Sequence, residues 1–191
     1  MRIISIDPSL RSLGMFFMED GDFNSNVIQR TEKDRLEVLK RFCLKFAREA
    51  ALGWDLLIIE MYAFGASNSR SITVAAEIGG LIRGIFAARG VPIIEVPIGT
   101  WKSVTGISMK KGTPMADSDY LNAIATKYKI RFKTVDEGDA YLLYQTVKEC
   151  GMRVWKSGTG PANLKARLEE LRLDTRTWPT SYGKVQEGYL L

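Results

Sequence analysis

The chain opens on a hydrophobic run that ends in an acid: RIISIDPSL, residues 2–10. Isoleucines at positions 3, 4 and 6 predict a strand buried within a sheet. Asp7 ends this run, and the Pro-Ser pair after it signals a turn. An acid at the end of a buried strand can be a turn residue, a helix cap or a functional group. Asp7 by itself does not distinguish among these three roles.

Length and composition favour one domain of ordinary globular type. The chain has 191 residues, of which 46% are hydrophobic, enough to bury one substantial core. No run of about 18 apolar residues occurs, and the N-terminus lacks the pattern of a secretory signal. We therefore expect a soluble, cytoplasmic protein without a membrane span. Cys43 and Cys150 lie far apart, which argues against a disulfide framework or a zinc site and predicts reduced thiols, with one or both in the core.

The absence of histidine restricts the chemistry available to an active site. It excludes the commonest general base, histidine-containing triads and the commonest transition-metal ligand. Any catalysis must then use carboxylates, lysines, hydroxyls or a hard metal ion. The net charge of +5 suits a polyanionic partner, although a basic protein without such a partner has the same charge.

Hydrophobic periodicity predicts an α/β fold with a mixed sheet. An Asp-Gly turn at residues 20–21 joins two strands into a hairpin, and a strand, a helix and a strand later in the chain predict a parallel crossover. The predicted strands are residues 2–7, 13–20, 21–30, 54–62 and 91–98, and the predicted helices are residues 34–52, 69–89, 115–128, 135–150 and 163–173. Residues 99–112 read as a basic loop. We expect a compact domain over residues 1–150 and a C-terminal extension over residues 151–191 that is peripheral or partly ordered.

Four acids follow buried strands or begin a late helix. Glu60 comes directly after LLII, and Asp136 and Asp139 are three residues apart, on one side of a helical turn. Taken singly, Asp136 reads as an N-cap and Asp139 as a first-turn acid favoured by the helix dipole. Those roles leave Glu60 unexplained. Together with Asp7, these acids predict an all-oxygen site for Mg²⁺ or Mn²⁺. Two such ions cleave phosphodiesters without a histidine base.

Three segments carry a resemblance to a known family. IDPSLRSLG (residues 6–14), LLIIEMYAFG (56–65) and DEGDAYLLY (136–144) resemble the RuvC-family Holliday junction resolvases of the ribonuclease H-like superfamily, over roughly residues 1–151. The resemblance implies a five-stranded mixed sheet flanked by helices and a crossover junction endodeoxyribonuclease that makes paired nicks in branched DNA. It also implies two Mg²⁺ ions per site, replaceable by Mn²⁺, held by Asp7, Glu60, Asp136 and Asp139.

The same resemblance implies residues that contact DNA. Lys102 matches a basic residue that assists at the scissile phosphate, and Lys110 or Lys111 matches a second basic position. Tyr62 and Phe64 flank the place of an aromatic that engages a junction base. Arg70 joins these DNA-contacting candidates. Ser9 departs from the glycine usual in bacterial members. Small, divergent members of this kind are typical of bacteriophages, so we expect a phage enzyme with a broader structure preference, acting in the host cytoplasm.

Two further patterns point to partner surfaces. KYKIRFK, residues 127–133, alternates basic and other residues and suits phosphate contacts, although a solvated basic face has the same pattern. Trp101 suits either base stacking or the core. The helix at residues 69–89 is apolar nearly all round, which predicts burial on more than one side, either in a homodimer or under the C-terminal extension.

The leading functional prediction is a Mg²⁺-dependent nuclease that resolves four-way junctions. The nearest alternative is a related nuclease that acts on flaps, forks or RNA-DNA hybrids. Two alternatives belong to other classes. One is an actin-like or sugar-kinase-like nucleotide-binding protein, against which the lack of a second glycine-rich phosphate loop argues. The other is a DNA-binding module that does not cleave, which would have no use for four acids.

Overall fold

A five-stranded sheet forms the centre of the molecule. The computed structural model describes residues 1–8, 12–29, 34–61, 70–107, 116–154 and 158–178, and for residues 70–75 it describes the helix but not the side chains. The strand order is β3-β2-β1-β4-β5. The strands are β1 (Arg2–Asp7), β2 (Ser12–Glu19), β3 (Asp22–Gln29), β4 (Leu56–Met61) and β5 (Ile93–Pro97). The β1-β2 and β2-β3 pairs are antiparallel, and the β1-β4 and β4-β5 pairs are parallel. The predicted mixed sheet is confirmed.

The hairpin between β2 and β3 has the turn that its sequence predicts. Asp20 and Gly21 both have positive φ, at 49° and 99°. Two residues of positive φ are what a two-residue turn needs if its twist is to match that of the flanking strands. Glycine adopts this conformation readily, and aspartate tolerates it better than most residues do. The turn therefore fixes the register in which Ser12 to Glu19 pair with Asp22 to Gln29.

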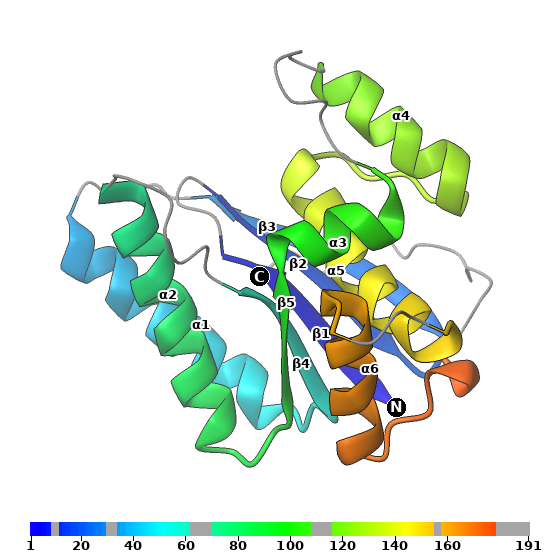
Figure 1. Cartoon of the computed structure of the whole chain (residues 1–191). Helices are drawn as coiled ribbons and strands as arrows, with labels where there is room; N and C mark the ends of the chain where they lie inside the picture. The colour runs from blue at the N-terminus through cyan, green and yellow to red at the C-terminus, as the bar shows by residue number, and fades with distance from the viewer. Residues whose placement is uncertain (9–11, 30–33, 62–69, 108–115, 155–157, 179–191) are drawn as a thin grey trace.

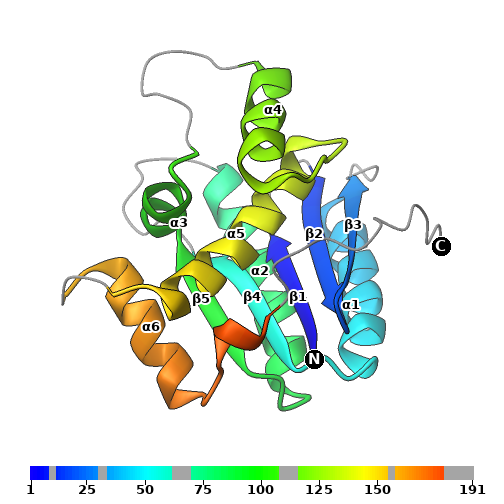
Figure 2. The ribbon, with the colours of Figure 1, turned by 90° about the vertical axis from the view of Figure 1, so that its right-hand side faces the viewer.

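Helices cover both faces of the sheet (Figures 1 and 2). The helices α1 (Arg35–Ala51) and α2 (Arg70–Ala87) lie on one face. The helix α5 (Val135–Met152) crosses the other face and is flanked by α3 (Ile98–Thr105), α4 (Asp117–Tyr128), α6 (Gly160–Glu170) and the 3-10 turn η1 (Thr175–Thr177). Each face has its own hydrophobic cluster. The sheet therefore separates an α1/α2 side from an α5 side.

Side-chain alternation along β1 assigns its residues to these two sides. Ile4 and Ile6 belong to the α1/α2 cluster, whereas Ile3 belongs to the α5 cluster. Because successive residues of a strand point to opposite faces, Asp7 shares the α5 side with Ile3. The same alternation in β4 places Glu60 on the side of Ile58, which also packs in the α5 cluster. Both acids therefore face the helix α5.

One predicted loop is a helix. Residues 98–105 form α3 directly after β5, with Pro97 as N-cap and Gly106 ending the helix at a φ of 64°. The prediction of a loop over residues 99–112 is therefore wrong for its first part. Gly99 and Thr100 in the first turn disguise the helix, whereas the inward side chains of Trp101 and Val104 have the spacing of one helical turn. In α1, Leu36 is exposed and Val38 takes the buried position.

The described part of the C-terminal extension packs on the α5 side. Leu164, Leu168 and Trp178 join the α5 cluster, and the Trp178 ring stacks on that of Tyr144 with 5.6 Å between centroids. The alternative that this extension covers α2 is therefore wrong for residues 158–178, which lie across the sheet from that helix. The domain boundary near residue 150 stays a prediction, and residues 179–191 fall outside the described part.

Two other predictions concern the thiols and the membrane. Cys150 is buried in the α5 cluster, and Cys43 is exposed on α1, so one of the two thiols is in the core as expected. Across the described residues, none of the helices combines the length and the apolar character needed to cross a membrane.

Candidate active site

Asp7 and Glu60 lie side by side at one edge of the sheet. The parallel register pairs Ile6 with Ile59, so the next residues of β1 and β4 are these two acids. Asp7 is 9% exposed, and Glu60 is partly buried. Parallel neighbouring strands end at the same edge, which is why acids so distant in the sequence come together. The predicted proximity of Asp7 and Glu60 is therefore confirmed.

The N-terminal turn of α5 brings the other two acids to the same edge. Thr134 and Glu137 form a reciprocal capping box that fixes where this helix starts. Glu137 also accepts a hydrogen bond from the Ser25 hydroxyl at 3.0 Å, so its carboxylate serves the structure around the cap. Asp136 and Asp139 are left to face the end of β1, close enough for their charges to act on Asp7.

Gly14 permits the close contact between α5 and the sheet. This glycine pairs with Asp7 in the β1-β2 ladder. A Cβ atom added to Gly14 would lie 1.9 Å from the backbone oxygen of Asp136. Only a residue without a side chain leaves room for the helix to rest there. Sequence reasoning missed this role of Gly14, although the residue lies within the motif that contains Asp7.

Neutral donors hold three of the four carboxylates. The Ser12 hydroxyl donates to Oδ2 of Asp136 at 2.5 Å, and the Trp101 indole N–H donates to Oε2 of Glu60 at 3.0 Å. The Tyr120 hydroxyl donates to Oδ1 of Asp139. These bonds orient the carboxylates without neutralising them. Sequence patterns do not reveal these three donors, because they come from β2, α3 and α4.

Burial and mutual repulsion dominate the electrostatics of these acids. The pKa of Asp7 is raised well above its usual value, first by burial and then by the charges of Glu60, Asp139 and Asp136. Burial is also the largest cause that raises the pKa of Glu60, and it raises that of Asp139 to about 7. Raised values mean that the fold disfavours the ionised forms. A cation at this edge would relieve that repulsion.

The donor set fits a hard divalent cation. Carboxylate oxygens are the ligands that Mg²⁺ and Mn²⁺ prefer, and the four acids provide such ligands next to one another. Within the described ranges, no three carboxylate or thiolate side chains surround one point closely enough to coordinate an ion as they stand. The four acids therefore lie near one another, and their carboxylates would have to move closer together to bind a cation.

Lys102 supplies positive charge beside these acids. It is exposed on α3, and its ammonium nitrogen lies 5.3 Å from the centroid of the Trp101 ring. Its charge partly offsets the rise in the pKa values of Glu60 and Asp139. Lys102 therefore lies beside the acids as predicted, but on helix α3 and not in a loop. Trp101 itself is 5% exposed and belongs to the core, so stacking on a DNA base is not its role.

The remaining predicted DNA contacts lie outside the described residues. They are Tyr62, Phe64, Lys110, Lys111 and the side chain of Arg70, whose backbone begins α2.

The segment 127–133 presents its basic residues to solvent. Lys127, Lys129 and Arg131 are exposed, whereas Ile130 is buried. Phe132 packs against the α5 cluster. This alternation anchors the segment and turns its charges outward. The segment leads directly into the capping box of α5, so its basic residues precede Asp136 closely in the chain.

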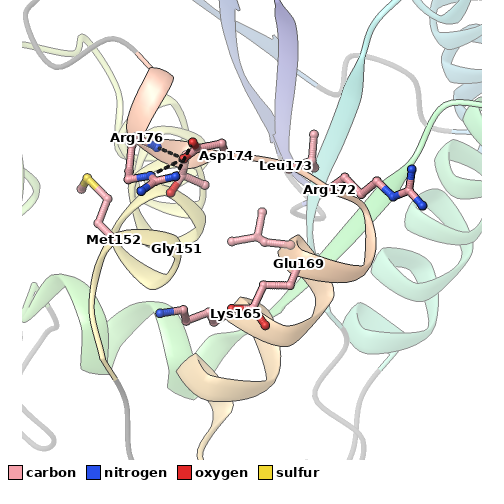
Figure 3. A pocket seen from close by; sticks show the side chains of 10 residues that line it. Gly151, Met152, Lys165, Glu169, Arg172, Leu173, Asp174 and Arg176 are labelled. Atoms are coloured by element: carbon pink, nitrogen blue, oxygen red, sulfur yellow. Dashed lines mark hydrogen bonds and ion pairs between the residues drawn. The ribbon is translucent and has the colours of Figure 1, made fainter.

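A surface pocket lies at the opposite end of α5 (Figure 3). It has a volume of about 410 Å³, and its lining includes Gly151, Lys165 and Arg172. Asp174 and Arg176, also in its wall, pair with each other at 2.7 Å. Asp136 and Gly151 are separated by about 22 Å along the helix at 1.5 Å per residue. The pocket therefore plays no part in the arrangement of the four acids.

Comparison with known proteins identifies the fold. Neither a family model nor a curated protein matches the sequence. A structure of T. thermophilus RuvC in complex with a Holliday junction substrate has a TM-score of 0.61 at 12% identity, covering 80% of this chain and 95% of that one. A second Thermus thermophilus RuvC structure has a TM-score of 0.57 at 14% identity, covering 80% of this chain and 96% of that one. The chain thus has the ribonuclease H-like fold of RuvC resolvases, as its sequence motifs predicted.

Proposed function

We propose that this chain is a Mg²⁺-dependent endonuclease that resolves four-way DNA junctions by paired nicks. The observation that carries the proposal is the gathering of Asp7, Glu60, Asp136 and Asp139 at one edge of a RuvC-like sheet, where the charges of the other three acids help to raise the pKa of Asp7. No histidine is present to act as a base instead. A set of buried and partly buried acids, whose charge the neighbouring Lys102 only partly offsets, favours a metal-dependent hydrolase over a purely structural protein.

The four acids would hold two divalent ions, Mg²⁺ or Mn²⁺. Asp7 would contact both ions, Glu60 and Asp139 would contact one each, and Asp136 would support one of them. When bound, two such ions activate the attacking water and neutralise the leaving oxygen of a phosphodiester. Ser12 and Tyr120 keep the α5 acids directed toward Asp7. Lys102, exposed beside Glu60, would offset the charge that builds up on the phosphate.

DNA is proposed as the substrate because basic side chains adjoin the acids. Lys102 flanks the site on α3, and Lys127, Lys129 and Arg131 lie exposed on the segment that leads into α5. Such residues bind the phosphate backbone whatever the base sequence. The RuvC structure with a TM-score of 0.61 was solved with a Holliday junction substrate, which supports branched DNA as the specific substrate class.

A homodimer is proposed because paired nicks require two active sites. Ile78, Ile82 and Phe86 bury one side of α2 against the α1/α2 cluster. Gly80 and Gly84 are exposed on this helix, and a Cβ atom added to Gly84 would meet nothing within 4 Å. Such a surface allows the close approach of a second helix. A symmetric dimer through residues 69–89 would present two sites to the opposing strands of a junction.

One panel of substrates tests this function. The purified protein is incubated with a synthetic four-way junction, a flap, a fork, an RNA-DNA hybrid and a linear duplex, each with EDTA, Mg²⁺ or Mn²⁺. We expect symmetric nicks in the junction with either metal and none with EDTA. Cutting of flaps, forks or hybrids in preference to the junction would favour the related nucleases. ATP binding without cutting would favour the nucleotide-binding alternative. A phage origin and a location in the host cytoplasm stay predictions.

A further inference from the structure

Trp101 connects the core of the molecule to the proposed metal ligand Glu60. It lies in α3, which follows β5 without an intervening loop, and β5 pairs with β4 so that Val96 is opposite Glu60. Its ring is part of the α5 cluster, with 5% of the residue exposed. A buried indole N–H without a partner is costly, and this one donates to Oε2 of Glu60 at 3.0 Å.

The same ring contacts the cation beside the acids. The ammonium nitrogen of Lys102 lies 5.3 Å from the centroid of the Trp101 ring, within the range of a cation-π contact. The edge of the indole thus directs Glu60, while its face lies near Lys102. The Thr105 hydroxyl donates to the Trp101 carbonyl at 2.7 Å, which secures the end of this short helix. One rigid, buried ring therefore touches both groups on the α3 side of the site.

We propose that Trp101 is a positioning residue that holds Glu60 in the orientation needed to bind a divalent cation. The inference rests on the proposed function and goes beyond it, because Trp101 is neither a metal ligand nor a DNA contact. Its hydrogen bond engages one oxygen of the Glu60 carboxylate, Oε2. Ligating carboxylates generally depend on such outer hydrogen bonds, and their removal weakens metal binding or activity about 10- to 100-fold.

The test is the substitution Trp101→Phe, which keeps an aromatic ring and removes the indole N–H. We expect the Mg²⁺ concentration that gives half-maximal cleavage to rise about 10-fold. The stabilisation of the fold by Mg²⁺, measured as a thermal shift, should need a correspondingly higher concentration. The matched control is Trp54→Phe. Trp54 is 6% exposed in the α1/α2 cluster, and its Nε1 has no hydrogen-bond partner within the described residues.

The two variants separate positioning from packing. If Trp101→Phe lowers stability as Trp54→Phe does but leaves both Mg²⁺ dependences unchanged, Trp101 acts only in the core and the inference is wrong. A change in both Mg²⁺ dependences that is confined to Trp101→Phe supports it.

A second measurement uses the wild-type protein, so it does not depend on whether Trp101→Phe folds. The chain has four tryptophans, so its metal-free protein gives four indole N–H signals in a ¹⁵N spectrum. We expect added Mg²⁺ to shift the Trp101 signal and to leave that of Trp54, assigned with Trp54→Phe, in place. If backbone signals near Asp7 move with Mg²⁺ while the Trp101 indole does not, the inference fails and the proposed metal site stands. If no signal moves at any Mg²⁺ concentration, both fail.

Discussion

The two ends of β1 both gather acids, but only one end balances their charge. At the N-terminal end, Asp20 pairs with the Met1 ammonium at 2.9 Å, and Glu19 pairs with Arg2 at 2.7 Å. The hydrogen bond from that ammonium lowers the pKa of Asp20. At the C-terminal end, burial and neighbouring acids raise the pKa of Asp7. The first end therefore stabilises its charges, whereas the second holds charges that the fold itself opposes.

This contrast separates the structural acids from the proposed metal ligands better than sequence position does. Both groups follow or precede a strand, and both look alike in the sequence. A structural acid contributes most when it is paired with a cation or accepts backbone hydrogen bonds. Acids that are buried together without enough neighbouring positive charge are not explained by a structural role, and a bound cation would explain them. Substitutions at the two ends of β1 and in the contact with α5 test that difference, beginning with the largest expected effect.

Asp7→Asn should remove cleavage. Asp7 is the acid proposed to contact both ions, so its amide is expected to reduce the cleavage rate about 10³-fold or more. Binding of the junction, measured by gel shift in EDTA or Ca²⁺, should stay within about two-fold of wild type because phosphate contacts dominate affinity. Glu60→Gln should behave likewise. Retained cutting in either variant would contradict the assignment of the site.

Gly14→Ala should disrupt the contact that brings α5 to β1. The new Cβ would lie 1.9 Å from the Asp136 carbonyl oxygen, which is backbone and cannot rotate away. We expect a loss of about 3 kcal/mol in the free energy of unfolding, measured in urea, together with a loss of cleavage. Gly99→Ala is the control, since a Cβ there meets nothing within 4 Å. Equal stability of the two variants would show that the close contact is not needed.

Asp139→Asn should stabilise the metal-free protein at high pH. The folded-state pKa of Asp139 is raised by burial to about 7, from its ordinary value of 3.8. Folding therefore favours the protonated form, and the stability that this form provides is lost as pH rises through about 7. The amide cannot ionise and still accepts from Tyr120. In EDTA at pH 8 we expect a gain of about 1–2 kcal/mol over wild type, shrinking toward pH 5. A difference that does not vary with pH would refute this reading.

Asp20→Asn should have the smallest effect and the opposite pH dependence. The ammonium of Met1 lowers the pKa of Asp20 in the folded state. Asp20 therefore stabilises the fold at pH values above its unfolded-state pKa, and this stabilisation is lost as the pH falls through its folded-state pKa. The pair is exposed, and salt screens it. We expect a slight decrease in melting temperature at pH 7 that vanishes in acid and in high salt, with cleavage unchanged. A large effect would remove the distinction between the two ends of β1.

Much of the fold follows from local patterns that the sequence displays. The isoleucines of β1 and the apolar run of β4 predict buried strands, and Asp20-Gly21 predicts the hairpin turn. The helix periodicity of residues 135–150 matches α5 closely. The spacing of Asp136 and Asp139, together with strand alternation at Asp7 and Glu60, predicts acids that face one another. These features are readable because each depends on neighbours within one helical turn or one strand.

Local sequence patterns did not predict the short helix α3 or the hydrogen-bond donors around the acids. Eight residues hold too few apolar positions to show a helical period, so residues 98–105 resembled a loop. Ser12, Trp101 and Tyr120 reach the acids across distances of 19 to 124 residues in the chain. No local pattern predicts which hydroxyl or indole will meet which carboxylate.

The strands, the longer helices, the acids at the strand ends and the exclusion of histidine chemistry could all be predicted from the sequence. The close contact of α5 with the sheet is visible in the folded molecule alone, because it depends on the absence of a side chain at Gly14 opposite Asp136. The folded molecule also shows that Trp101 is a buried donor to Glu60 and that α6 and Trp178 complete the core. Period and composition are properties of short segments, whereas burial and hydrogen bonding are properties of surfaces that meet only when the chain has folded.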